Sequence, residues 1–112
     1  MFRTSTQAKP VVMLKGITRR TLTYGDRMIL VEFTIQAGAV FPEHSHPYEQ
    51  IGYLSKGAGT LQISTESCEL RPGSSWCIPA NVSHRAEFSK KSVAIDIFSP
   101  VREDYRDVRE EP

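Results

Sequence analysis

The sequence predicts an all-β domain of the sandwich or barrel type. Turn residues interrupt the chain at short intervals, and the apolar residues between these interruptions favour a period of two. Many short strands at this spacing favour a sandwich or barrel over a parallel α/β sheet. The chain has 112 residues, of which 39% are hydrophobic and 24% charged. We therefore expect a single domain over residues 1–112, with a core large enough to fold without disulfides.

Eight segments have the length and composition of strands. The clearest is Met28–Ile35, in which Ile29, Val31, Phe33 and Ile35 share one face. The Gly25-Asp26 pair just before it is typical of a tight hairpin connection. The strands are expected to build a barrel core over residues 11–100. The expected strands are Val11–Lys15, Arg19–Thr23, Met28–Ile35, Gln50–Leu54, Gly59–Ser64, Ser75–Ile78, His84–Phe88 and Val93–Phe98.

The last stretch, residues 101–112, is a charged tail with the sequence VREDYRDVREEP. Its apolar residues are Val101, Tyr105 and Val108, and the last two are three apart, as on one face of a helix. The tail therefore forms either a short amphipathic helix docked on the barrel or a frayed end beyond Tyr105.

Charge and composition exclude some partners. Lys and Arg number 14 against 13 acids, and the net charge is +1. This balance argues against nucleic acid or an anionic membrane surface as the partner, because both select a concentrated basic excess. The first residues lack the apolar stretch of a signal peptide, and no apolar run is long enough to span a bilayer. We expect a cytoplasmic protein, with Cys68 and Cys77 as reduced thiols that behave as small hydrophobes.

The three histidines are candidate metal ligands. His44 and His46 alternate by two, which places both imidazoles on one face of an extended segment with Cα atoms about 6–7 Å apart. Gln50 has the same parity, but a straight strand would carry it about 13 Å from His46. The chain must therefore bend near Pro47 if both are to meet His84, which starts a later strand. The spacing leaves two interpretations open, a metal site or structural histidines in a polar pocket.

Two segments resemble the two conserved motifs of the cupin family. Residues 38–57, GAVFPEHSHPYEQIGYLSKG, have glycines and histidines at the spacings of the first motif, with Gln50 where many cupins have glutamate. Residues 72–84, PGSSWCIPANVSH, resemble the second motif, with Asn81 in place of a frequent glycine. Phe88 replaces the asparagine that ends that motif. The resemblance implies a jelly-roll β-barrel with a divalent metal in its mouth.

By this resemblance, the metal ligands are His44, His46, Gln50 and His84. Three imidazoles and an amide are all neutral, so they leave the charge of the dication uncompensated and favour Lewis-acid chemistry. The set lacks the two-histidine, one-carboxylate arrangement of many non-haem iron oxygenases. It fits nickel, zinc, manganese or iron without selecting one. The alternative is that Glu49 is the ligand and Gln50 points away, which would require a shift in register.

Asp96 lies on an otherwise apolar strand. Val93, Ile95 and Ile97 define one face, and Asp96 shares the other with Phe98. A carboxylate there is unfavourable unless it reaches water, a partner or a ligand. One interpretation is a structural ion pair with an arginine such as Arg85. The other places Asp96 in the pocket as a general acid/base, with Arg102 binding an anionic group.

Two stretches, HSHPYEQIGY and DIFSPVREDY, resemble a branch of small cupins that act in pectin and alginate degradation by ketonizing 4,5-unsaturated uronates. This resemblance implies Asp96 and Arg102 as catalytic residues. It also implies Phe98 and Arg102 as substrate-binding residues. Tyr53 is a further expected substrate-binding residue. Tyr53 and Trp76 both lie in expected strands, where an aromatic side chain more often forms core or pocket wall than a specific recognition element.

The expected function is thus a metal-dependent isomerase that acts on an anionic sugar acid. Two alternatives remain: a noncatalytic module that senses a small ligand or metal, and another cupin isomerase, lyase or dioxygenase. We also expect a homodimer, because a small barrel leaves apolar faces and sheet edges uncovered, and two-fold pairing is the commonest solution.

Overall fold

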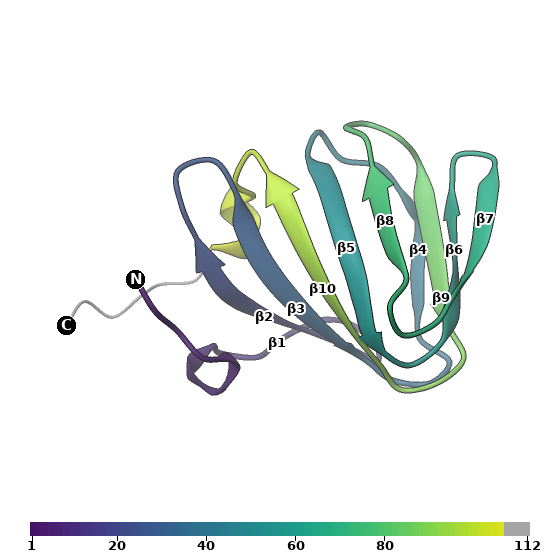
Figure 1. Cartoon of the computed structure of the whole chain (residues 1–112), viewed down its shortest axis with the longest axis horizontal. Helices are drawn as coiled ribbons and strands as arrows, with labels where there is room; N and C mark the ends of the chain where they lie inside the picture. The colour runs from purple at the N-terminus through teal and green to yellow at the C-terminus, as the bar shows by residue number, and fades with distance from the viewer. Residues whose placement is uncertain (107–112) are drawn as a thin grey trace.

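The computed structural model describes residues 1–106, which form two antiparallel sheets facing each other as a jelly-roll (Figure 1). One sheet has six strands in the order β1-β2-β3-β10-β5-β8, and the other has four in the order β4-β9-β6-β7. The strands are β1 (Val11–Leu14), β2 (Ile17–Tyr24), β3 (Ile29–Ile35), β4 (Val40–His44), β5 (Glu49–Lys56), β6 (Gly59–Ile63), β7 (Glu66–Leu70), β8 (Ser75–Ile78), β9 (His84–Phe88) and β10 (Ser92–Ser99). Two short 3₁₀ helices, η1 (Ser5–Gln7) and η2 (Glu103–Tyr105), flank them.

The core lies between the two sheets and follows from the period-two pattern. In β3, alternate residues from Ile29 to Ile35 are buried, and the residues between them are only partly buried. β10 pairs with β3 along its length and alternates in the same way. Each fully buried aliphatic side chain contributes about 1.5–3 kcal/mol. The same alternation places Asp96 and Phe98 together on the inner face of β10, a choice of face that the sequence left open.

The eight expected strands are all present, with ends that differ from expectation by at most two residues. Two further strands were missed, Val40–His44 and Glu66–Leu70, and both lie at the edges of the four-stranded sheet. Four of the five residues of β7 are exposed, and so are the last three of β4, which also contains Pro42. Edge strands of this kind bury too little to show an alternating pattern.

The chain after β10 packs against the barrel. Tyr105, in η2, is 7% exposed and meets Phe33 and Phe98 edge-on, with ring centroids 6.3 and 5.4 Å away. The Thr21 hydroxyl donates a hydrogen bond to the backbone oxygen of Tyr105. The docked element is therefore one 3₁₀ turn, and Val108 lies outside the described residues.

The connection before β3 and the two cysteines were also addressed by the sequence. The amide of Gly25 donates to the oxygen of Met28 at 2.9 Å, which confirms the hairpin connection. Cys68 and Cys77 are free, as expected, but both are exposed on the edge strands β7 and β8, so neither packs as a small hydrophobe. Within residues 1–106, no helix is long and apolar enough to cross a membrane.

Candidate metal centre

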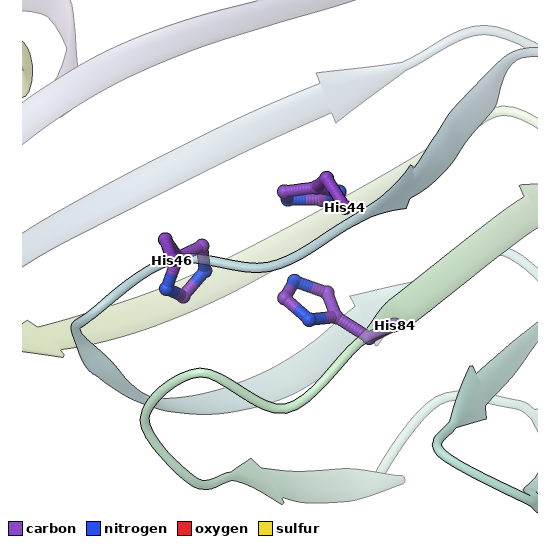
Figure 2. Close-up of side chains that lie close together, drawn as sticks. All are labelled: His44, His46 and His84. Atoms are coloured by element: carbon purple, nitrogen blue, oxygen red, sulfur yellow. The ribbon is translucent and has the colours of Figure 1, made fainter.

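Three histidines converge at one end of the barrel (Figure 2). His44 ends β4 and is the cross-strand partner of His84, which begins β9. His46 follows two residues after His44, in the loop that leads to β5. One ring nitrogen from each histidine lies within 4.8 Å of the others. His46 and His84 are buried, while His44 is exposed at the rim.

Backbone carbonyls fix the tautomer of each ring. The Nδ1 atoms of His44, His46 and His84 lie 2.8, 3.1 and 2.9 Å from the carbonyl oxygens of residues 42, 48 and 82. A carbonyl can only accept, so each Nδ1 carries the proton and each Nε2 is left as a lone-pair donor in the neutral ring. Burial lowers the pKa of both His46 and His84, which keeps these imidazoles neutral near pH 7. Neutral imidazole with a fixed Nδ1–H is the form that binds metal.

Gln50 joins this cluster from β5. Its Oε1 lies 3.0 Å from Nε2 of His46, and its Nε2 donates to Oδ1 of Asp96 at 2.8 Å. In the tautomer that the carbonyl imposes, the Gln50 oxygen and the His46 nitrogen direct lone pairs at each other. A shared cation removes this repulsion, so the donor set fits a divalent metal.

The expected bend between His46 and Gln50 is present, because the chain passes from one sheet to the other through the loop between β4 and β5. Gln50 lines the cavity, whereas Glu49 is exposed and does not. The geometry therefore favours Gln50 over Glu49 as the fourth ligand.

Asp96 is a buried carboxylate beside the histidine cluster. It is 2% exposed, and burial raises its pKa to about 6, although hydrogen bonds from Gln50 and Trp76 oppose the shift. The indole Nε1 of Trp76 donates to Oδ1 at 3.0 Å. The expectation of an ion pair with Arg85 is wrong, because Arg85 lies outside the barrel and pairs with Glu87 at 2.9 Å.

Arg102 is held at the cavity by aromatic rings. Its guanidinium carbon lies 3.8 Å from the ring centroid of Tyr105 and 4.9 Å from those of Tyr48 and Phe98. Asp104 binds its Nε and Nη2 at 3.2 and 2.9 Å. The Arg102 side chain is 14% exposed, so its guanidinium is largely enclosed by aromatic rings, and it also lines the cavity.

One cavity brings together most of the candidate residues. His44, His46, Gln50, His84, Asp96, Phe98 and Arg102 all line it. Phe98 is 1% exposed, so it forms the packed wall beneath His46 rather than an open stacking surface. Tyr53 is 49% exposed and does not line the cavity, because odd-numbered residues of β5 face outward. The assignment of Tyr53 to substrate binding is therefore wrong.

Three residues of the site make contacts with Asp96 or Arg102 that the sequence did not predict. Trp76 reaches Asp96, while Tyr48 and Tyr105 enclose Arg102. Trp76 and the buried Ile78 are two residues apart in β8, so they lie on the same face of the strand, and the side chain of Trp76 is expected to point inward. No local pattern indicates that the partner would be Asp96.

The jelly-roll and its histidine cluster define a cupin, and the chain belongs to the cupin domain family, whose model matches residues 31–98. A relative, the pectin degradation protein KdgF of Dickeya dadantii strain 3937, is 32% identical over 92 residues, covering 80% of this chain and 84% of the relative. The structure of KdgF from Halomonas sp. superposes with a TM-score of 0.89 at 29% identity, covering 95% of this chain and 98% of that one. An RmlC-like cupin from Shewanella frigidimarina NCIMB 400 also gives 0.89, at 27% identity, covering 94% of this chain and 95% of that one.

Proposed function

We propose that this cupin is a metal-dependent isomerase that ketonizes 4,5-unsaturated uronates. The observation that carries the proposal is the proximity of a buried carboxylate, Asp96, to the histidine cluster, with Arg102 in the same cavity. A base, a Lewis-acid site and an anion-binding cation are what such a reaction requires. The similarity to a pectin degradation protein supports a uronate as the substrate.

His44, His46, Gln50 and His84 would hold one divalent transition metal, such as nickel, zinc, manganese or iron. A bound dication would supply Lewis-acid polarisation of substrate oxygens, undiminished by any ligand charge because all four ligands are neutral. The fixed Nδ1–H bonds keep the three rings oriented towards one point.

Asp96 would move the proton. The reaction is an isomerisation without redox change: the anomeric hydroxyl loses its proton, and the bond from the anomeric carbon to the ring oxygen breaks to leave an aldehyde. The electron pair of that bond passes to the ring oxygen and leaves an enolate, which becomes a ketone as carbon 4 gains the proton. A carboxyl with a pKa of about 6 can accept and return that proton near neutral pH.

Arg102 would bind the uronate carboxylate. Asp104 already accepts from Nε and Nη2 of the guanidinium, so Nη1 is left to donate to the substrate carboxylate. The partial burial of Arg102 strengthens the attraction. The aromatic rings that enclose Arg102 restrict its movement, so the substrate would meet an already oriented cation.

The test is turnover by metal-loaded protein. We expect about one metal per chain by elemental analysis, and faster loss of the ultraviolet absorbance of the conjugated double bond than in the spontaneous rearrangement. His46→Ala should lose the metal and the acceleration. Metal uptake without acceleration of any unsaturated uronate would contradict the assignment and indicate a binding module. Oxygen consumption by an iron-loaded form would instead indicate another class of cupin enzyme.

We also propose that the chain forms a homodimer. Ile51 and Ile97 are cross-strand partners on the outer face of the six-stranded sheet, and Tyr53 lies beside them. These side chains are 51%, 39% and 49% exposed. A contiguous apolar patch on an outer sheet face is a feature of protein interfaces.

A further inference from the structure

Both hydrogen bonds that Asp96 accepts within residues 1–106 end on the same oxygen. Trp76 Nε1 donates to Oδ1 at 3.0 Å, and Gln50 Nε2 donates to Oδ1 at 2.8 Å. The second oxygen, Oδ2, accepts neither. Because Asp96 lines the cavity, Oδ2 is the carboxylate oxygen left to act on a bound molecule.

Gly52 makes the bond between Trp76 and Asp96 possible. Asp96, Gly52 and Trp76 are direct cross-strand neighbours on β10, β5 and β8, so Gly52 lies between the other two. A Cβ atom at Gly52 would overlap both the indole nitrogen of Trp76 and Oδ1 of Asp96. The indole therefore crosses the middle strand through the space that the missing side chain leaves. The backbone angle of Gly52 is one that other residues adopt, so space explains this glycine.

We propose that Trp76 is a positioning residue for Asp96, and that Gly52 is the space-making residue that lets it act. This inference rests on the proposed function and identifies what holds its proton-transfer group. The indole N–H can only donate, and the ring is rigid, so it holds Oδ1 in one place. Gln50, whose side-chain oxygen lies against His46, donates to the same oxygen of Asp96. Two donors on one oxygen fix the rotation of the carboxylate and keep Oδ2 directed at the substrate.

The kinetic test uses Trp76→Phe, which keeps an aromatic ring and removes the donor. A small displacement of a reacting group lowers rate strongly, so we expect kcat to fall by about 10-fold or more while KM changes less than about 2-fold. Cys77→Ser is the matched control, because Cys77 is the next residue of β8 and is exposed on the other face. It should keep wild-type kinetics. Equal kcat values for Trp76→Phe and wild type would overturn the proposal.

A second test does not depend on turnover. The chain has one tryptophan, so its nuclear magnetic resonance spectrum has one indole N–H signal. We expect that proton to exchange slowly with solvent in wild type and in Asp96→Asn, whose side-chain oxygen still accepts. It should exchange rapidly in Asp96→Ala and in Gly52→Ala, where the bond is lost.

The two tests separate this inference from the proposed function. A protected indole proton in a protein that fails to turn over unsaturated uronates would contradict the proposed function and support the positioning of Asp96 by Trp76. Rapid exchange in the folded wild-type protein would overturn the positioning, whatever the activity.

Discussion

Asp96 is a buried carboxylate that lowers stability and that, in the proposed function, transfers the proton. Its strand neighbours on the inner face, Ala94 and Phe98, are apolar and at most 3% exposed. Removing a carboxylate from water disfavours its charged form, and the two donors from Gln50 and Trp76 offset only part of that effect. The outcome is a pKa of about 6 instead of 3.8, which suits proton transfer near neutral pH.

This raised pKa predicts a pH-dependent loss of stability. Between the unfolded value of 3.8 and the folded value of about 6, the folded state binds more protons than the unfolded state. The contribution of Asp96 to the free energy of unfolding therefore has its full value below pH 3.8, and it falls as the pH rises to about 6. The loss amounts to about 3 kcal/mol, at 1.36 kcal/mol per pKa unit.

Metal-free wild type and Asp96→Asn can be compared by urea denaturation from pH 4 to pH 7. The free energy of unfolding of the wild type should fall as Asp96 loses its proton, whereas Asp96→Asn has no such titration. The free energy of unfolding of the variant minus that of the wild type should therefore increase from pH 4 to pH 7. Other titrating groups are common to both proteins and cancel. A difference that stays constant with pH would contradict the raised pKa.

Asp96→Asn also separates a catalytic role from a structural one. The change is nearly isosteric and keeps an acceptor for Trp76 and Gln50, so the fold and bound metal should be retained. Turnover of an unsaturated uronate should fall by about 100-fold or more, the scale of general acid–base contributions. Steady-state kinetics beside elemental analysis measures both. A variant that loses stability but keeps its activity per folded molecule would indicate a structural Asp96.

Arg102→Ala should act mainly on substrate binding. A hydrogen-bonded charge pair is worth about 1.5–3 kcal/mol, so KM should rise by about 10-fold or more, with a smaller fall in kcat. The control is Arg85→Ala, which removes an exposed arginine paired outside the barrel. Steady-state kinetics on the carboxylate substrate and on its methyl ester is the measurement. An equal change in KM for both substrates would contradict carboxylate recognition.

At the scale of elements, strand pairing between segments distant in the sequence assembles the site. β4 and β9 align His44 with His84, and β10 and β5 align Asp96 with Gly52. β4 is an edge strand with little burial of its own, so its backbone pairing with β9 is what holds His44. Rigid strands are better supports for a precise site than loops.

The segment after β10 predicts a coupling between packing and binding. Tyr105 packs on Phe33 and Phe98 and covers the Arg102 guanidinium at 3.8 Å. Tyr105→Ala should lower the free energy of unfolding by about 3–5 kcal/mol, as for other large buried rings. It should also raise KM, because Arg102 loses its support.

Tyr105→Phe is the matched variant, since it keeps the ring and the stacking. Its free energy of unfolding should stay within about 1.5 kcal/mol of the wild-type value, and its KM should be unchanged. Urea denaturation and steady-state kinetics report the two effects. If Tyr105→Ala changed stability and left KM unchanged, this segment would be a structural anchor without a part in binding.

At the scale of the whole molecule, the outer face of the six-stranded sheet predicts dimerisation. Light scattering at micromolar concentration and moderate salt should give twice the mass of the chain. Ile51→Lys should shift the protein towards monomer, because it places a charge at the centre of the apolar patch. Thr60→Lys, exposed on the other sheet, should leave the mass unchanged. A wild-type monomer under these conditions would contradict the homodimer.

The sequence predicted more of the fold than of the contacts within the site. Strands with one buried face were found because alternation is a local property, as in β3. β4 and β7 were missed because edge strands need not alternate. Tyr53 was misassigned because its aromatic character suggested a pocket, while the parity of β5 turns it outward.

The sequence by itself determined the all-β class, the placement of His44 and His46 on one face, and the placement of Asp96 and Phe98 on the face opposite to Val93, Ile95 and Ile97. Each of these depends on the spacing of residues along one strand. Only the tertiary structure decided that Gln50 and Trp76, 46 and 20 residues away, share one oxygen of Asp96. That outcome depends on which strands become neighbours and in what register, and registers are set by the packing of the whole barrel.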